Sequence, residues 1–226
     1  MIPALLYLLF KKLRRQHCRF KDLNPFSRLN RRHGQKVVVL IGLLLFVSLV
    51  LSAQVHHYKV MRGNSEVGWA TIEKQTDSNT TTITMVNEVK LKFLFTYESY
   101  AKEISQFRDG KLQHSYYYKR TNGSVKADRH TRLVGNIYEV GESSKQTLNI
   151  SPVTFNTLCM YFAEPVNITR VYSDNHQKFL DLVKESDGGY SFTSSDGTTN
   201  TFYYYRGICY KIKINHSFYS AVLLLK

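Results

Sequence analysis

The strongest constraint on the fold is an alternation of apolar and polar side chains that runs from Val55 to the C-terminus. Successive side chains of a β-strand point to opposite faces, so this alternation is typical of half-buried strands. In the clearest run, the apolar residues Ile83, Met85, Val89, Leu91, Phe93 and Phe95 alternate with Thr84, Glu88, Lys90 and Lys92. A second run predicts Leu112, Tyr116 and Tyr118 on one face, opposite Gln113, Ser115 and Lys119. A third run predicts Ile208, Tyr210, Ile212 and Ile214 on one face, opposite Cys209, Lys211 and Lys213.

Short turn signals separate these runs at intervals of about ten residues, which is typical of an antiparallel meander. They include Asp109-Gly110, Asn122-Gly123 and Asp196-Gly197, pairs that supply the positive φ angles of tight hairpins. One segment, 152–162, has helical spacing instead, with an apolar stripe of Phe155, Leu158, Cys159 and Phe162. We therefore predict an all-β fold, a curled antiparallel meander or incompletely closed β-barrel with one short helix across it.

The charge and hydropathy of the N-terminal part set it apart from this β domain. The net charge is +14, but residues 1–53 carry ten Lys/Arg against one acid, whereas residues 54–226 carry 21 against 16. The domain itself is thus only weakly basic, which argues against a nucleic-acid partner. Residues 37–53 are uncharged and follow a basic stretch, as in the core of a secretory signal peptide or a membrane anchor.

We therefore expect three parts: a basic leader at 1–36 that need not be translated, an export core or anchor at 37–53, and an exported domain at 54–226. Cleavage after Ala53 is the expected processing site, since small residues end the apolar stretch. This arrangement predicts a periplasmic or cell-envelope location, with an inner-membrane anchor if residues 37–53 are retained. Cys159 and Cys209 are the only thiols of the domain, and alternation places them on different faces, which disfavours a disulfide.

The sequence contains no complete catalytic or metal-binding pattern. Glu98 and Glu103 are five residues apart in a strand pattern, so they are expected on opposite faces and in solvent. No histidine pair has the helical spacing of zinc hydrolases, and no phosphate-binding glycine loop occurs. We expect no catalytic residues, no metal and no cofactor. Lys90, Lys92, Lys211 and Lys213 would form a basic patch for anionic lipid if their strands were neighbours.

Several short segments resemble a secreted bacterial family of unknown function. They are YKV at 58–60, FRDGKL at 107–112, LCMYFAEP at 158–165, VYS at 171–173, SDGTTN at 195–200 and YRG at 205–207. The likeness covers essentially residues 55–226 and is distantly similar to the LolA/LolB-like lipoprotein carriers. That resemblance implies a curled half-barrel with a helix in its concavity. The segments are mostly turns and packing positions, so no catalytic residues are carried over.

These features favour a non-enzymatic cell-envelope protein that binds an apolar, lipid-like ligand in the concave face of the sheet. The expected partners are a lipid or a lipoprotein acyl chain, and a membrane surface. The expected ligand-binding residues are the aromatic ones on the predicted concave strands and lid: Phe93, Phe95, Tyr116, Tyr118, Phe155 and Phe162. The alternative is a structural or adaptor protein of the envelope, with a packed core and no small-molecule ligand. An enzyme of unrecognised type is the weaker third class.

Overall fold

Nearly all of the described chain is β-structure. The computed structural model describes residues 52–92, 96–142, 145–217 and 219–226, which belong to the compact unit Val50–Lys226. The strands of the first half are β1 (Ser52–Arg62), β2 (Ser65–Asp77), β3 (Thr80–Lys92), β4 (Thr96–Arg108), β5 (Lys111–Thr121), β6 (Ser124–Val134), β7 (Ile137–Gly141) and β8 (Lys145–Leu148). Those of the second half are β9 (Arg170–Ser173), β10 (Lys178–Asp181), β11 (Val183–Lys184), β12 (Tyr190–Thr193), β13 (Thr199–Tyr205), β14 (Ile208–His216) and β15 (Tyr219–Leu225).

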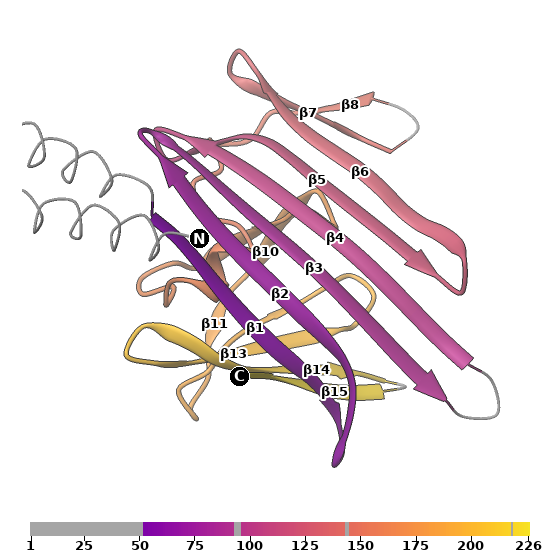
Figure 1. Ribbon diagram of the computed structural model, residues 1–226. Coiled ribbons are helices and arrows are strands. Elements are labelled where there is room, and N and C mark those ends of the chain that lie inside the picture. Colours follow the sequence, from indigo (N-terminus) through magenta and orange to yellow (C-terminus); the bar gives the residue numbers. More distant parts are fainter. Residues whose placement is uncertain (1–51, 93–95, 143–144, 218) are drawn as a thin grey trace, which may run out of the picture. The chain divides into compact units, whose positions relative to one another are not determined.

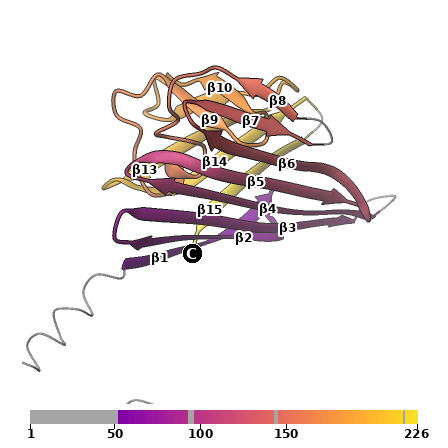
Figure 2. The ribbon, with the colours of Figure 1, turned by 90° about the horizontal axis from the view of Figure 1, so that it is seen from above.

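Thirteen of these strands form one antiparallel sheet, whose order is β11-β12-β13-β14-β15-β1-β2-β3-β4-β5-β6-β7-β8. The C-terminal strand β15 pairs with β1, so the two halves of the chain join in the middle of the sheet. Strands β8 and β11 end the sheet and do not pair with each other, and the sheet is therefore curled but not closed (Figures 1 and 2). This confirms the predicted all-β, incompletely closed meander.

The segment between β8 and β11 lies inside the curl and connects its two wings, which are the strands β1–β8 and the strands β11–β15. It contains the separate two-stranded sheet of β9 and β10. Toward one wing, the Leu112 N–H donates to the Val153 oxygen at 2.8 Å. Toward the other wing, the Tyr204 hydroxyl donates to the Met160 oxygen at 2.7 Å. The inner segment thus supplies part of the core from a stretch with no strand alternation of its own.

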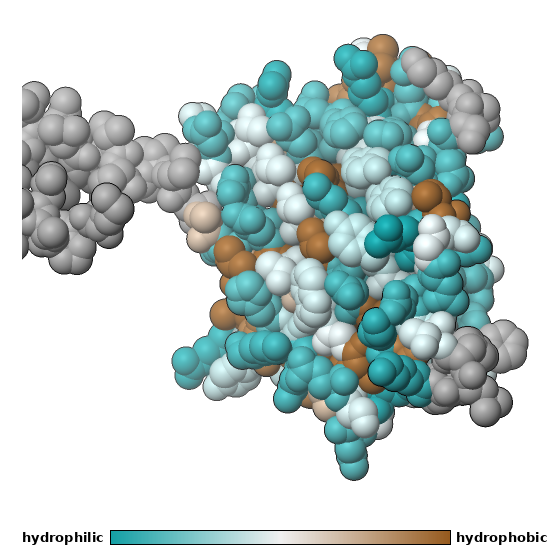
Figure 3. All heavy atoms as spheres, turned by 45° about the vertical axis from the view of Figure 1, so that its right-hand side comes forward, coloured by the Kyte–Doolittle hydropathy of each residue, from teal (hydrophilic) through white to brown (hydrophobic). Residues whose placement is uncertain are grey.

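The core follows the inward side chains of the strands, as the alternation predicts for β3. Ile83 and Met85 are buried, while Glu88 and Lys90 are exposed on the other face. The predicted inward positions Phe93 and Phe95 lie outside the described residues. The outer surface in Figure 3 is mostly hydrophilic with scattered hydrophobic residues, as expected of the other half of each alternating strand.

The predicted helix at 152–162 is wrong, because only the 3-10 turn η1 (Cys159–Tyr161) is helical there. The backbone before it is extended and pairs with a distant strand: Tyr172 donates to the Phe155 oxygen, and Thr157 donates to the Tyr172 oxygen. The Asn156 side chain then accepts the Cys159 N–H at 3.2 Å and starts the turn. These hydrogen bonds to a segment far away in the sequence replace those of a helix.

Two predicted strand faces are wrong on one side of a β-bulge, in which one extra residue shifts the alternation. In β5 the extra residue is Gln113, because Gln106 pairs with His114 and Phe107 with Leu112. In β14 the extra residue is Tyr210, because Tyr203 pairs with Lys211 and Tyr204 with Cys209.

The second bulge turns Cys209 away from the face predicted for it. Cys209 is fully buried, whereas Tyr210 is exposed. Both Cys209 and Cys159 are free thiols.

The predicted leader and apolar segment lie outside the described residues, apart from Ser52 and Ala53. These two residues open β1 and pair with Thr76 and Gln75 of β2. The predicted cleavage site after Ala53 therefore falls within the first strand. The described residues contain no helix with the length and hydropathy that a membrane span requires.

Candidate ligand-binding site

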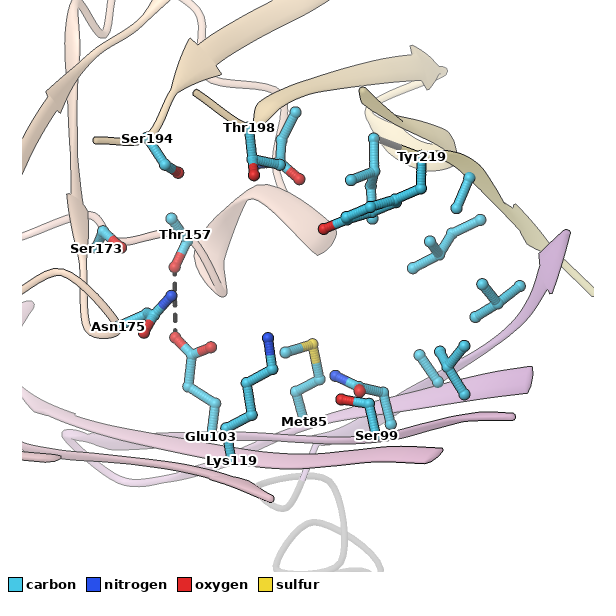
Figure 4. A pocket seen from close by; sticks show the side chains of 18 of the residues that line it. Met85, Ser99, Glu103, Lys119, Thr157, Ser173, Asn175, Ser194, Thr198 and Tyr219 are labelled. Carbon is cyan, nitrogen blue, oxygen red and sulfur yellow. Dashed lines mark hydrogen bonds between the residues drawn. The ribbon is translucent and has the colours of Figure 1, made fainter. Parts of the chain in front are cut away.

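The concave side of the sheet contains a cavity of about 580 Å³. Its walls come from the strands around β1–β5, from β12–β15 on the opposite side, and from the inner segment around η1 (Figure 4). This volume is within the range of pockets that hold small molecules. The cavity exists because the inner segment fills only part of the space enclosed by the curl.

One part of the cavity wall is apolar. It is formed by inward side chains of β2 and β3 and by those of β14 and β15: Val67, Ala70, Met85, Val89, Leu91, Ile214, Ala221 and Leu223. Met85, Val89 and Leu91 belong to the run whose inward face the alternation predicts correctly. An apolar surface of this kind favours a hydrocarbon group, because its transfer from water is favourable.

The other part of the wall carries small polar side chains and one lysine. Thr157, Ser173 and Asn175 project from the inner segment, and Ser194 and Thr198 from the β12–β13 hairpin (Figure 4). Lys119 reaches the same part of the cavity from β5. Its inward direction follows from the bulge at Gln113, which turns Ser115, Tyr117 and Lys119 to the concave side.

Two buried carboxyl groups lie beside this polar part. Glu103 is 5% exposed and lines the cavity, while Asp174, which follows β9, is 1% exposed. Asp174 Oδ2 accepts hydrogen bonds from Asn156 Nδ2 at 2.6 Å and from Ser105 Oγ at 3.3 Å. Thr157 Oγ1 donates to Glu103 Oε1 at 3.3 Å. The two acids also hydrogen-bond each other, which requires one of them to keep a proton.

The proton belongs to Glu103. Burial, the nearby charge of Asp174 and the hydrogen bond between them raise the pKa of Glu103 well above its usual range. Burial also raises the pKa of Asp174, but hydrogen bonds from Ser115, Asn156 and Ser105 oppose that shift. Asp174 Oδ1 is buried and has no partner unless a protonated carboxyl donates to it. Asp174 is therefore the carboxylate and Glu103 the neutral donor.

The expectation that Glu103 is solvated is wrong, although its separation from Glu98 onto the opposite face is confirmed. Glu98 is exposed and forms an ion pair with Lys90 on the outer face. Sequence reasoning missed the buried acid because β4 has no apolar stripe: its inward residues include Ser99, Glu103 and Ser105. The partner, Asp174, lies far along the chain in a turn of the inner segment. No local pattern connects the two.

A family model matches residues 58–226, most of the chain. The chain belongs to DUF6134, a domain of unknown function. A comparison with curated proteins finds no match. The DUF6134 domain is also similar to the crystal structure of a β-barrel-like protein of domain of unknown function DUF1849 from Brucella abortus, at 12% identity and a TM-score of 0.47. That match covers 78% of this chain and 96% of the other. The resemblance to LolA/LolB-like carriers is not confirmed.

Four of the predicted ligand-binding residues of this DUF6134 domain do not line the cavity. Tyr116 and Tyr118 are on the outer face, where the bulge at Gln113 directs them, and Tyr116 packs on His130 with ring centroids 4.7 Å apart. Phe155 and Phe162 are partly buried against the core. Phe162 stacks on His56 at 4.7 Å. Phe93 and Phe95 lie outside the described residues.

The basic patch of Lys90, Lys92, Lys211 and Lys213 required that their two strands be neighbours, and this condition is not met in the DUF6134 sheet. Strands β3 and β14, which carry the four lysines, are separated by β15, β1 and β2. Lys211 and Lys213 instead lie over the Tyr203 ring, at 4.4 and 4.8 Å from its centroid. Among the described residues, no group of three or more His, Cys, Asp or Glu is placed to hold a metal ion.

Proposed function

We propose that this protein is a non-enzymatic binding protein of the cell envelope that holds an apolar, lipid-like ligand in the concave cavity. The observation that supports this most is the cavity of about 580 Å³, one part of whose wall is apolar. Each methylene transferred from water into such a site contributes about 0.8 kcal/mol, so a chain of about ten methylenes gains about 8 kcal/mol before the costs of binding. A free lipid and the acyl chain of a lipoprotein both fit this chemistry.

The envelope location rests on the uncharged segment at 37–53 and the basic residues before it. The alternative of an adaptor with a packed core has less support, because such a core would fill the concavity. A binding role is favoured over catalysis by the arrangement of the acids. Glu103 and Asp174 hydrogen-bond each other, and only Glu103 reaches the cavity. They thus do not present two carboxyl groups to one substrate.

The test uses an uncharged fluorescent apolar probe, diphenylhexatriene, titrated into the full chain. Val89→Trp places a large ring at an apolar lining position of β3. Val86→Trp is the matched control, because it makes the same change on the outer face of the same strand. Circular dichroism checks that both variants fold.

We expect the wild type and Val86→Trp to bind the probe alike, and Val89→Trp to bind it at least about tenfold more weakly, since the added ring takes up cavity space. Equal binding by the two folded variants, or no binding by the wild type, would contradict the proposed function.

A further inference from the structure

The polar part of the cavity contains a cation without a carboxylate partner. Among the described residues, no Asp or Glu oxygen lies within 4.0 Å of Lys119 Nζ, in contrast to Lys90, Lys213 and Lys226. Lys119 is half-buried and projects into the cavity beside Glu103 (Figure 4). A lysine that only solvates the surface would lie on the outer face, as Lys102 does on the neighbouring strand β4.

Together with Lys119, the other ionisable groups along the cavity leave the net charge of its lining positive. Glu103 is neutral, since burial and the charge of Asp174 raise its pKa. Burial lowers the pKa of His176, so it is also neutral at neutral pH. Asp196 is ionised: its partial burial opposes this, but hydrogen bonds from Thr198 lower the pKa of Asp196. The Asp196 carboxylate accepts the Thr198 N–H at 3.0 Å in its own turn. Arg62 is a second cation of the lining.

Neutral hydrogen-bond donors accompany Lys119 in this part of the cavity. Ser173 and Ser194 line the wall and are 4% and 8% exposed. The Ser173 oxygen accepts the His176 N–H at 3.3 Å, which leaves its own hydroxyl proton to donate. Two cations, Lys119 and Arg62, and one ionised carboxylate, Asp196, give the lining a net charge of +1. This net charge and the neutral donors suit a singly charged acceptor better than a phosphate, which would bring more negative charge than the lining balances.

We propose that Lys119 is the counter-ion for the head group of the ligand, and that the ligand is a single-chain amphiphile with a carboxylate. Its hydrocarbon chain would lie along the apolar wall that includes Met85, Val89 and Leu91, with the carboxylate at Lys119 and the serine hydroxyls. This inference rests on the proposed function and names the ligand class for the same cavity. It also gives the protonated Glu103 a role, because a neutral carboxyl there does not repel the head group.

The experiment displaces bound diphenylhexatriene with three competitors of one chain length: dodecanoate, dodecanol and dodecyltrimethylammonium. For the wild type we expect dodecanoate to compete at least about tenfold more strongly than dodecanol, as for a charge-assisted hydrogen bond, and the cationic amphiphile to compete least. Lys119→Met should remove the preference for dodecanoate, so that dodecanoate and dodecanol compete about equally. Lys102→Met, on the outer face, is the matched control and should keep the preference.

The outcomes separate the two proposals. Equal competition by dodecanoate and dodecanol in the wild type, or an intact preference in Lys119→Met, would refute the proposal of a carboxylate head group at Lys119. Neither result would contradict the binding of an apolar chain in the cavity. Displacement by none of the three competitors would refute the lipid-like ligand itself, and the head-group assignment with it.

Discussion

The protonated state of Glu103 leads to a prediction about stability. In the unfolded chain Glu103 titrates near its ordinary pKa of 4.5, whereas in the folded protein burial and Asp174 raise that pKa well above it. Between the two values the folded state binds more protons than the unfolded state, so the free energy of unfolding falls as the pH rises. The fall amounts to about 1.4 kcal/mol per pH unit for one proton, and it ends above the raised pKa.

Glu103→Gln should remove this pH dependence, because an amide donates to Asp174 at every pH. Urea unfolding followed by circular dichroism at several values between about pH 5 and pH 8 measures it. The free energy of unfolding of the variant, relative to that of the wild type, should rise by about 1.4 kcal/mol per pH unit over this window. Glu98→Gln is the control: Lys90 lowers the pKa of the exposed Glu98, so this variant should run parallel to the wild type. Parallel curves for Glu103→Gln would refute the buried proton.

Two further changes test how the inner segment and the sheet are held. Tyr138→Phe should lower the free energy of unfolding by about 2–4 kcal/mol. The reason is that the buried hydroxyl donates to the Leu112 oxygen and accepts the Val153 N–H, both at 3.1 Å. A change below about 0.5 kcal/mol in a urea titration would contradict this. Gly68→Ala should lower the free energy of unfolding by about 2–3 kcal/mol, because the Cβ of the new alanine would lie 2.1 Å from the Glu88 backbone oxygen. In Gly123→Ala the new Cβ meets no atom within 4 Å and the only cost is the strain of a positive φ of 79°, so this variant should lose less stability in the same assay. The reverse order would show that β2 and β3 are not so closely paired.

The sequence predicts the fold well wherever alternation is uninterrupted. The β3 run is the clearest case, since Ile83 and Met85 are buried and Val89 and Leu91 line the cavity. The prediction is wrong for Tyr116 and Tyr118 because a bulge inserts Gln113 and reverses the faces that follow. A bulge of this kind depends on how β5 pairs with β4, so the spacing within β5 alone does not reveal it.

The candidate site is harder to predict than the fold, because its polar part is built from segments that are distant in the sequence. The pair of Glu103 and Asp174 forms only when the inner segment folds into the curl, and β4 shows no apolar stripe that marks its inward face. The helical spacing of Phe155, Leu158 and Phe162 is real, but pairing of residues 155–157 with Tyr172 outweighs it. Local propensity yields to tertiary hydrogen bonds at such positions.

The central claim is that the concave cavity holds an apolar chain, and native followed by denaturing mass spectrometry of the full chain from its own cells tests it most directly. We expect added mass on the native protein that is lost on denaturation and matches a lipid. The added mass should be absent from Val89→Trp but present in Val86→Trp. A bare polypeptide mass for the wild type, or the same added mass on both variants, would contradict it.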